Sequence, residues 1–378
     1  MARARAAKAA PSEAVSATWY HSHGGKPKSP GRDQVDVKKL QGSSPRKASA
    51  AKRTIQRTAR RPTATGATAT GKTEVAVLLA MRVGGEIISA DSRQVYRGVS
   101  VGTAKPPGMW RNGCYVHHGI PHRLMDFLDL REEYNAGMFA RDASRCADDV
   151  RCRRRTPIIV GGTGFYISAY AYGLSALPPR DYELRARLLA IAQRDGPEHL
   201  HGILAQRDPE RAAQIHPRNT HRIVRALEIV LSTGMTVAQV LRTLPVPERR
   251  AVSLAGIAIG RDNLRRRIAE RTRRMFAAGL VEETESLLAE GMPADAPGFT
   301  AIGYSHVIAY VRGSISREDA LERTMRDTIR YARAQQTWFR RDKHIVWFDA
   351  DDLRPAALAE RLRNHFVSTG AWPDGEES

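Results

Sequence analysis

One short motif restricts the possible fold of this chain more than any other feature. Residues 66–73 read Gly-Ala-Thr-Ala-Thr-Gly-Lys-Thr and fit the pattern G-x-x-x-x-G-K-[ST] of a phosphate-binding loop, or P-loop. In such a loop, successive backbone N–H groups surround a phosphate, and the next helix points its N-terminus at the anion. The residues expected to bind phosphate are Gly66, Ala67, Thr68, Ala69, Thr70, Gly71, Lys72 and Thr73. The motif predicts a strand–loop–helix unit of an α/β sheet.

Two side chains of this loop have separate expected roles. Lys72 would neutralise the terminal phosphate, and the Thr73 hydroxyl would hold Mg²⁺. Residues 74–81 form a helix-favouring run directly after the loop. Because residues 62–66 and 67–71 nearly repeat each other, a loop in another register also stays open.

The segment before the loop does not look like the strand that should lead into it. Residues 55–65 read Ile-Gln-Arg-Thr-Ala-Arg-Arg-Pro-Thr-Ala-Thr, and a strand there would bury Arg57, Arg60 or Arg61 in a sheet covered on both faces. An unpaired charge buried in this way is strongly destabilising. We therefore expect the core to begin near Gly66, the sheet to lack its strand beneath the loop, and the loop to be weakened.

Residues 1–60 are predicted to be a disordered basic tail. They are rich in Ala, Ser, Lys, Arg, Pro and Gly, and they carry more than half of the net charge of +20. The tail could be a basic arm that touches RNA or an organelle-targeting peptide. It could also be other than native coding sequence, with a misplaced start or a shifted frame, and the missing strand favours this third interpretation.

Length and composition set the broad class. The 378 residues leave room for two or three domains, and no run of about 18 apolar residues could cross a membrane. Cys114, Cys146 and Cys152 are too sparse for a disulfide framework, which indicates a cytoplasmic protein with reduced thiols. The chain beyond residue 60 is also basic, and this favours a polyanionic partner as much as a plain basic surface.

The rest of the chain alternates between strands and helices. Strands are predicted at 86–90, 121–126, 156–160, 252–259 and 344–348, and helices at 134–155 and from 261 onward. This alternation predicts a P-loop NTPase-like parallel sheet with covering helices. Residues 61–174 and 241–350 would form this core, residues 175–240 an all-helical insertion domain, and residues 351–378 a C-terminal tail.

A cluster of possible metal ligands lies in the first half of the chain. Cys114, His117, His118 and His122 stand close together, but no second ligand pair has the spacing of a structural zinc site. We expect no metal there.

The motifs, taken together and in this order, resemble those of the tRNA dimethylallyltransferase family, whose members prenylate the adenine next to the anticodon. The matching segments are G-A-T-A-T-G-K-T from 66, I-I-S-A-D-S-R-Q-V-Y-R-G from 87, G-T-A-K-P from 102, P-H-R-L-M-D from 121, G-G-T-G-F-Y from 161, I-H-P-R-N-T-H-R-I-V-R-A-L-E from 215, A-I-G-Y from 301 and Y-A-R-A-Q-Q-T-W-F-R from 331. The resemblance extends from about residue 66 to residue 349.

This resemblance implies transfer of a dimethylallyl group from dimethylallyl pyrophosphate to the exocyclic amine of the adenine 3′ of the anticodon in the tRNA anticodon stem-loop. The P-loop would bind the pyrophosphate leaving group without hydrolysing an NTP, with Lys72 and Mg²⁺ on Thr73 stabilising its charge. Asp91, at a strand end, is the predicted base or acceptor for the amine proton, or alternatively a Mg²⁺-linked acid. Thr163 would orient the pyrophosphate or the amine, unless it is a plain turn residue.

The same resemblance assigns RNA contacts to two groups of residues. The adenine must leave the base stack to react, and its surroundings would be gripped by Asp91, Ser92, Arg93 and Gln94. The RNA phosphates or the pyrophosphate would be contacted by Arg185, His221, Arg222, Ile223, Val224 and Arg225. The alternative for the arginines on the 221–225 segment is the solvated face of an amphipathic helix.

The chain differs from the family pattern at a few positions, and three other functions stay open. The differing residues are Ala67, His221, His306, Ile329 and Ala334. The other functions are a P-loop kinase of small molecules with Asp91 as base, a prenyltransferase of free adenine nucleotides, and an inactive RNA-binding relative. The arginine-bearing helical insertion argues against the free-nucleotide enzyme. We expect a monomer.

Overall fold

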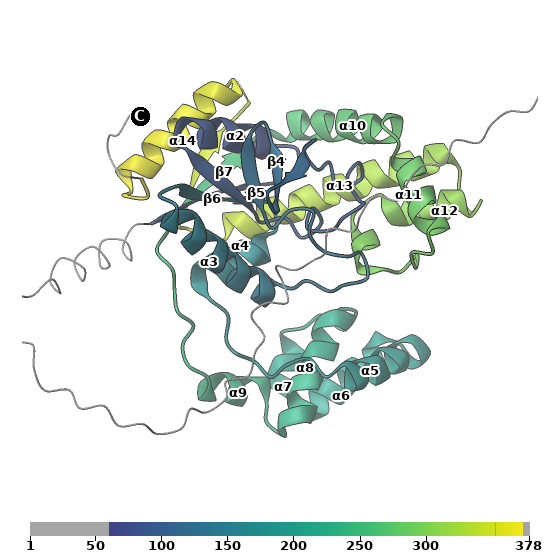
Figure 1. Cartoon of the computed structure of the whole chain (residues 1–378). Coiled ribbons are helices and arrows are strands. Elements are labelled where there is room, and N and C mark those ends of the chain that lie inside the picture. The colour runs from purple at the N-terminus through teal and green to yellow at the C-terminus, as the bar shows by residue number, and fades with distance from the viewer. Residues whose placement is uncertain (1–59, 352, 373–378) are drawn as a thin grey trace, which may run out of the picture. The chain divides into compact units, whose positions relative to one another are not determined.

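A computed structural model describes residues 60–351 and 353–372 of the chain. Its centre is an eight-stranded sheet with the order β3-β4-β5-β2-β6-β1-β7-β8. The strands are β1 (Arg61–Gly66), β2 (Gly85–Ser89), β3 (Met109–Arg111), β4 (Cys114–His117), β5 (Ile120–Arg123), β6 (Thr156–Gly161), β7 (Val252–Ala258) and β8 (Ile345–Asp349) (Figure 1). The predicted disordered tail lies outside the described residues, apart from Arg60.

The sheet confirms the predicted P-loop NTPase-like class. All neighbouring strands from β5 to β8 in the sheet order are parallel, while β3 and β4 add an antiparallel edge beside β5. Four predicted strands, at 86–90, 156–160, 252–259 and 344–348, are confirmed as β2, β6, β7 and β8, and the strand predicted at 121–126 is the shorter β5. The strands that sequence patterns did not predict are β1, β3 and β4.

The strand expected to be missing is present in the middle of the sheet. β1 pairs in parallel with β6 on one side and with β7 on the other, and Thr63, Ala64 and Thr65 are buried. Threonine favours extended backbone because it is branched at Cβ. The Thr65 hydroxyl donates to the Gly161 carbonyl oxygen over 3.2 Å, so the buried polar atom has a partner.

The arginines that argued against this strand lie at its beginning. The Arg61 guanidinium pairs with Asp148 at 3.0 Å and lies over the Tyr170 ring, 5.6 Å from its centroid, while Arg60 is exposed. A paired guanidinium at the amino end of a strand avoids the cost of an unpaired buried charge. The predictions of a missing strand and of a core that begins near Gly66 are therefore wrong. The expectations of a weakened loop and a shifted reading frame were based on the absence of this strand, so its presence removes their support.

Two helical layers cover the sheet, and each encloses its own apolar core. One layer contains α2 (Lys72–Arg82) and α14 (Pro355–Ser368), and the other contains α3 (Ala136–Cys152) and α4 (Gly164–Tyr172) (Figure 1). Leu358, Leu362 and Phe366 of α14 are buried in the same cluster as α2. The predicted C-terminal tail is therefore wrong, because α14 completes the core that supports the helix behind the P-loop.

The segment between β7 and β8 adds a further set of helices. They are α10 (Arg261–Ala277), α11 (Leu280–Ala289), the 3-10 helix η1 (Pro297–Thr300), α12 (Tyr304–Val311) and α13 (Arg317–Arg340). Phe276, Leu280, Phe299 and Tyr304 are buried in one cluster together with residues that follow β2. These helices therefore pack against the loops at the carboxyl ends of the strands.

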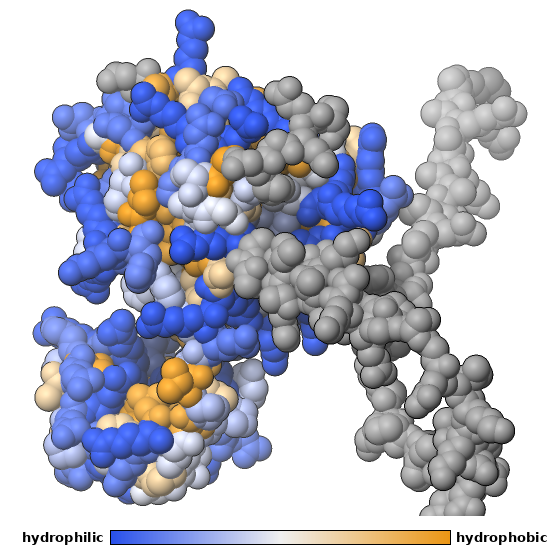
Figure 2. Space-filling model, turned by 90° about the vertical axis from the view of Figure 1, so that its left-hand side faces the viewer, coloured by the Kyte–Doolittle hydropathy of each residue, from blue (hydrophilic) through white to orange (hydrophobic). Residues whose placement is uncertain are grey.

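Residues 182–243 form helices with an apolar cluster of their own. The helices are α5 (Tyr182–Asp195), α6 (Pro197–Arg207), α7 (Pro209–Ala213), α8 (Thr220–Thr233) and α9 (Val237–Thr243), and the cluster includes Leu200, Leu204 and Leu227. Figure 2 shows hydrophilic residues over most of one face of the molecule, with apolar residues in separate patches. Within residues 60–351 and 353–372, no single helix is long and apolar enough to span a membrane, although α8 and α9 together meet that test as a bent pair.

Candidate active site

The P-loop joins β1 to α2 and is held by backbone packing on both sides. Gly66 has a φ of +151°, and a Cβ on it would collide with the backbone of Ile257 in β7, so the loop begins where a side chain has no room. The Thr70 hydroxyl donates to the Ala67 carbonyl oxygen over 3.0 Å. The Lys72 ammonium donates to the same carbonyl oxygen. Two side chains of the loop therefore fasten its C-terminal part to the Ala67 carbonyl group.

The surroundings of Lys72 make the charge of its ammonium group sensitive to a nearby anion. Burial lowers the pKa of its ammonium to about 7, while the nearby Asp91 carboxylate raises this pKa and the Arg271 guanidinium lowers it. Arg271 reaches from α10 and donates to the Thr68 hydroxyl over 3.1 Å. Two cationic groups from distant parts of the chain thus meet at one loop, where a phosphate would stabilise both charged forms.

A cavity of about 850 Å³ opens beside this loop. Its walls come from the P-loop, from residues 91–94 after β2, from residues 102–104 and from residues 161–165 after β6. Helices α10 and α13 close the other side. The cavity therefore lies at the carboxyl ends of the parallel strands, where ligands bind in sheets of this kind.

The two predicted catalytic residues, Asp91 and Thr163, lie on neighbouring loops of this cavity. The Asp91 carboxylate accepts from the backbone N–H groups of Arg93 (2.8 Å) and Gln94 (3.3 Å) through the same oxygen. The Thr163 hydroxyl accepts from the Ser92 N–H over 2.9 Å and donates to the Ser92 hydroxyl over 3.2 Å. Among the described residues the second Asp91 oxygen has no hydrogen-bond partner, whereas the Thr163 hydroxyl holds the loop that follows Asp91.

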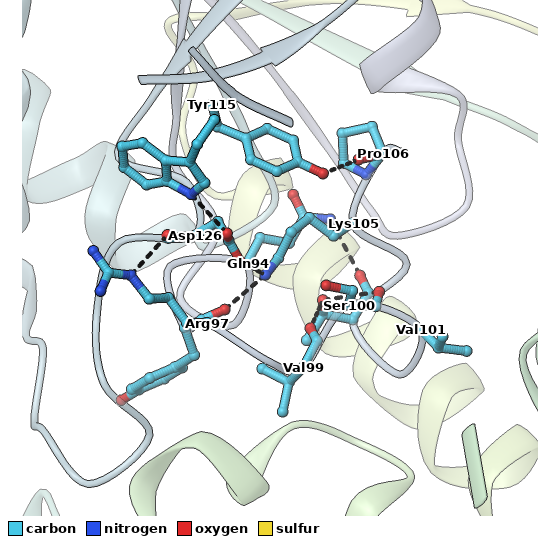
Figure 3. A network of polar contacts seen from close by, with 12 residues as sticks. Gln94, Arg97, Val99, Ser100, Val101, Lys105, Pro106, Tyr115 and Asp126 are labelled. Carbon is cyan, nitrogen blue, oxygen red and sulfur yellow. Dashed lines mark hydrogen bonds and ion pairs between the residues drawn. The ribbon is translucent and has the colours of Figure 1, made fainter. Parts of the chain in front are cut away.

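Gln94 is oriented by a loop that follows it in sequence. Its side-chain amide donates to the carbonyl oxygens of Thr103 (3.1 Å) and Ala104 (3.2 Å). Figure 3 shows Gln94 within a polar network that also contains Lys105 and Asp126. Lys105 is buried and donates both to Asp126 and to a backbone carbonyl, which anchors the end of the loop. Gln94 is thus a fixed element of the cavity wall.

Sequence reasoning missed several residues of the site, among them Arg271 and Gln335. Gln335 of α13 accepts from the Thr68 N–H over 2.8 Å and donates to the Gly162 carbonyl oxygen over 2.7 Å. It therefore ties the P-loop to the loop after β6. Gln335 lies inside the segment from 331 that resembles the family pattern. This resemblance indicated that the segment matters, but it did not indicate what Gln335 contacts. Arg271 is one of many arginines on α10, and nothing in their spacing distinguishes it.

Three exposed aromatic side chains also line the cavity. They are Phe165 on α4 and Tyr331 and Trp338 on α13. Tyr331 interacts with Thr163 and Gln335, and burial of its hydroxyl raises the pKa to about 12, so the phenol stays neutral near pH 7. Phe165 and Trp338 meet edge to face, with ring centroids 6.4 Å apart. The cavity thus combines cationic groups with aromatic faces, as nucleic-acid sites do.

The RNA contacts predicted on the helical insertion separate into two groups. Arg185 and Arg225 both pair with Glu228, at 3.4 Å each, and Glu228 is 1% exposed. Arg225 also donates to the Pro178 carbonyl oxygen over 2.7 Å. Sequence reasoning missed Glu228, whose buried charge requires these guanidinium partners. Arg185 and Arg225 therefore serve the insertion's own structure.

The remaining predicted contacts on α8 also divide by exposure. Ile223 and Val224 are completely buried in the apolar cluster of the insertion, so the prediction that their side chains contact RNA is wrong. Period 3.6 places them on the inner face of α8. His221 and Arg222 are exposed on the outer face and are free to meet a partner.

The cluster of possible metal ligands is built around a buried histidine. His122 lines the cavity and shares a hydrogen bond of 2.9 Å with the Ile120 carbonyl oxygen, and burial lowers its pKa to about 4, so the imidazole is neutral. His117 lies beside it, with ring centroids 5.8 Å apart. In the part of the chain that the structure describes, no three His, Cys, Asp or Glu side chains are placed to hold a metal ion.

Comparison with known proteins agrees with this arrangement. The model of the IPP transferase family matches residues 94–342, and that of the isopentenyl transferases matches residues 63–109. The chain belongs to the IPP transferase family. The isopentenyl transferase match begins inside β1 and includes the whole P-loop, so it covers most of the strand that sequence patterns missed.

Curated relatives of this IPP transferase are named tRNA dimethylallyltransferases. The protein of Thermomicrobium roseum is 45% identical over 75% of this chain and 84% of its own length. That of Elusimicrobium minutum is 42% identical over 76% of this chain and 94% of its own length. The predicted resemblance is therefore confirmed, and the chain is a member of a family of prenyl-transferring enzymes.

Solved structures give the same result for the fold. The full-length tRNA isopentenylpyrophosphate transferase of Bacillus halodurans is 33% identical, with a TM-score of 0.59 over 82% of this chain and 98% of that chain. A eukaryotic dimethylallyltransferase acting on tRNA shares the fold at 24% identity, with a TM-score of 0.65 over 84% of this chain.

Proposed function

We propose that this protein transfers a dimethylallyl group from dimethylallyl pyrophosphate to the exocyclic amine of the adenine 3′ of the anticodon in tRNA. The observation that carries the proposal is the meeting of Lys72, Arg271 and Asp91 in one cavity, in a chain of this family. An anion-binding loop with two cations suits a pyrophosphate leaving group. A carboxylate beside it suits the loss of a proton from the attacking amine.

The P-loop would act on the leaving group. Breaking the C1–O bond of the prenyl donor leaves its electron pair on the pyrophosphate, so negative charge grows there in the transition state. The loop N–H groups, the Lys72 ammonium and the Arg271 guanidinium are held in place before reaction, and donors arranged in advance stabilise developing charge most effectively. No phosphoryl group moves, so the reaction needs no ATP.

Mg²⁺ fits this site through few protein oxygens. Thr73 lies in the first turn of α2, is exposed and lines the cavity, and among the described residues its hydroxyl has no hydrogen-bond partner. Asp91 lines the same cavity, and within the described part of the chain one of its carboxylate oxygens accepts no hydrogen bond. Mg²⁺ commonly binds through one or two protein oxygens together with phosphate groups and waters. When bound, it would neutralise part of the pyrophosphate charge.

Asp91 would act on the attacking amine. The exocyclic nitrogen of adenine is a poor nucleophile because its lone pair is delocalised into the ring. As the N–C1 bond forms, the nitrogen becomes cationic, and the free Asp91 oxygen is the acceptor for the proton it releases. The backbone N–H groups of Arg93 and Gln94 hold the other oxygen, which keeps the carboxylate oriented during the transfer.

The cavity also offers an apolar wall for the prenyl group. The wall is formed by buried side chains that line the cavity: Ala76 on α2, Ile87 on β2, Met125 after β5 and Val160 on β6. A five-carbon hydrocarbon placed against them leaves water, at about 25 cal/mol per Å² of apolar surface buried. The same wall would keep water away from the reactive allylic carbon.

The RNA would approach with its target base out of the stack. The aromatic faces of Tyr331 and Trp338 at the cavity suit a stacked base, and stacking on an aromatic side chain contributes about 1–3 kcal/mol per base. Arg222 is exposed on the helical insertion and suits a phosphate contact. These features favour RNA over a free nucleotide, which would need no second binding surface.

The test is a transfer reaction with isotope-labelled dimethylallyl pyrophosphate and unmodified tRNA. The expected result is label on the adenine 3′ of the anticodon, found by mass spectrometry of nuclease fragments, without ATP in the mixture. Label in free AMP but not in tRNA would replace the RNA substrate by a nucleotide. Phosphorylation of an acceptor that depends on ATP would replace the proposal by a kinase.

A further inference from the structure

A single carboxylate holds one wall of the cavity from behind. The loop of residues 99–105 follows β2, and its residues 102–104 line the cavity. On the side of α11, the Glu283 carboxylate accepts three backbone hydrogen bonds, from the N–H groups of Ser100 (2.7 Å), Val101 (2.8 Å) and Gly102 (3.2 Å). Three successive peptide planes are therefore fixed by one side chain from a helix about 180 positions further along the chain.

Glu283 is itself held by Tyr304. The Tyr304 hydroxyl, at the start of α12, donates to Glu283 Oε1 over 2.6 Å, and the tyrosine is completely buried. Gly102 lies against the tyrosine ring, and a Cβ at this position would overlap ring atoms. Glycine is required here because of this close approach. The carboxylate, the ring and the loop thus form one packed unit.

The opposite side of the same loop carries acceptors for two residues of the active site. The Thr103 carbonyl oxygen accepts from the Gln94 amide (3.1 Å) and from the Arg271 guanidinium (3.3 Å), and the Ala104 carbonyl oxygen accepts from the same amide (3.2 Å). Arg271 continues to the P-loop through Thr68. A shift of the loop would therefore move groups beside both substrates.

We propose that Glu283 is a positioning residue of the transfer reaction, which fixes loop 99–105 so that its carbonyl oxygens orient Gln94 and Arg271. This inference rests on the proposed function, because it takes Gln94 to face the RNA base and Arg271 to face the pyrophosphate. The position of the loop determines which atom of the Gln94 amide faces the cavity. Both N–H bonds of the Gln94 amide are directed at the loop, so the side chain offers its oxygen to a base and accepts from an N–H group.

Loss of the Glu283 charge should disturb both sides of the cavity. Hydrogen bonds to a charged group are stronger than those between neutral groups, so the three loop contacts are strong restraints. In Glu283→Gln the amide keeps one acceptor oxygen, but its N–H₂ group cannot accept from the donors that share the other oxygen, the Gly102 N–H and the Tyr304 hydroxyl. The loop is then held less firmly, and its carbonyl oxygens orient Gln94 and Arg271 less well. Binding of pyrophosphate and use of tRNA should therefore weaken together.

The test compares Glu283→Gln with Glu285→Gln in the full chain. Glu285 lies on the same helix, is exposed and has no partner among the described residues, so it is a matched control. The expected results for Glu283→Gln are a Kd for inorganic pyrophosphate about tenfold higher by calorimetry and a kcat/KM for tRNA at least about tenfold lower. Glu285→Gln should match the wild type in both.

Hydrogen exchange separates positioning from a general loss of stability. Glu283→Gln should speed amide exchange in residues 99–105 at a temperature where the variant is fully folded. Wild-type exchange in the loop, together with wild-type pyrophosphate affinity, would overturn the inference even if the melting temperature fell. Should Glu283→Gln fail to fold, Tyr304→Phe keeps both the carboxylate and the ring and should give a smaller loss in the same direction.

The two proposals fail in different ways. Pyrophosphate affinity and loop exchange do not depend on prenyl transfer, so they test the positioning role even if the wild type transfers nothing to tRNA. Absence of transfer by the wild type would sink the proposed function alone. Active wild-type enzyme with an unaffected Glu283→Gln variant would sink the positioning role alone.

Discussion

Lys72 should make pyrophosphate binding depend on pH above neutrality. Burial lowers the pKa of its ammonium to about 7 in the ligand-free protein. A bound pyrophosphate places negative charge beside the ammonium and raises its pKa towards the ordinary value of about 10.4. Between these two values the free protein has lost a proton that the complex keeps. Binding therefore takes up a proton from solution, and the affinity falls as the pH rises.

The size of the effect follows from the difference between the two pKa values. Well above pH 7 each pH unit weakens binding by up to tenfold. Because Lys72 is already about half deprotonated at pH 7, the Kd at pH 9 should exceed the Kd at pH 7 by up to about 50-fold. Below pH 7 Lys72 is charged in both states and contributes no dependence. The window is wide because burial lowers the pKa of the Lys72 ammonium, and the Arg271 guanidinium lowers it further against the opposing effect of the Asp91 carboxylate.

Calorimetric titration with inorganic pyrophosphate measures both the Kd and the number of protons taken up on binding. Runs in two buffers with different ionisation enthalpies give the proton uptake, expected to be about one per site near pH 8.5. Lys72→Met is the control, because its pH dependence retains only the protonation of the ligand itself. If the Kd depends on pH equally in the wild type and in Lys72→Met, the explanation is refuted. Lys72 would then not be a group that gains a proton when pyrophosphate binds.

Four further substitutions test other parts of the protein. Asp91→Asn should lower kcat by about 10²–10⁴-fold while tRNA binding in a filter assay stays within a few-fold, and near-normal turnover would remove Asp91 from the chemistry. Gln335→Leu should raise the KM for dimethylallyl pyrophosphate by roughly tenfold, because the P-loop and the loop after β6 lose their shared partner, and an unchanged KM would contradict this role. Arg222→Ala should reduce the salt slope of tRNA binding by about one unit. Arg185→Ala should instead lower the melting temperature and leave that slope unchanged, since its guanidinium is engaged with Glu228.

Local sequence patterns were sufficient to predict the frame of the active site. The P-loop is defined by four residues in eight positions, and Asp91 follows a short buried strand whose carboxyl end must face the ligand side of a parallel sheet. Both features depend on neighbours in sequence. For this reason the loop, Asp91 and Thr163 were predicted and are found in one cavity.

The central strand β1 was missed because its stability depends on distant partners. A Thr-Ala-Thr sequence carries little apolar signal, and only the flanking strands β6 and β7 and the Gly161 carbonyl make its burial favourable. The arginine at its start needed Asp148, which lies 87 positions away. From composition alone, burial of the arginine at the start of β1 looked unfavourable, but its tertiary contact with Asp148 removes that free-energy cost.

Residue roles on the helices were hidden for the same reason. Arg185 and Arg222 look alike in sequence, yet one pairs with the buried Glu228 and the other is exposed. Gln335 and Glu283 act on loops that lie 267 and about 180 positions away, respectively. No spacing rule within a helix connects a side chain to a loop at such a distance.

In the proposed reaction this P-loop protein uses pyrophosphate as a leaving group and RNA as the acceptor. The most direct measurement is a single-turnover reaction of the full chain with dimethylallyl pyrophosphate and unmodified tRNA, in which released pyrophosphate and prenylated adenine are counted together without any NTP. The account predicts one pyrophosphate for each adenine modified 3′ of the anticodon. Pyrophosphate release without RNA modification, or modification only when ATP is added and consumed, would contradict it.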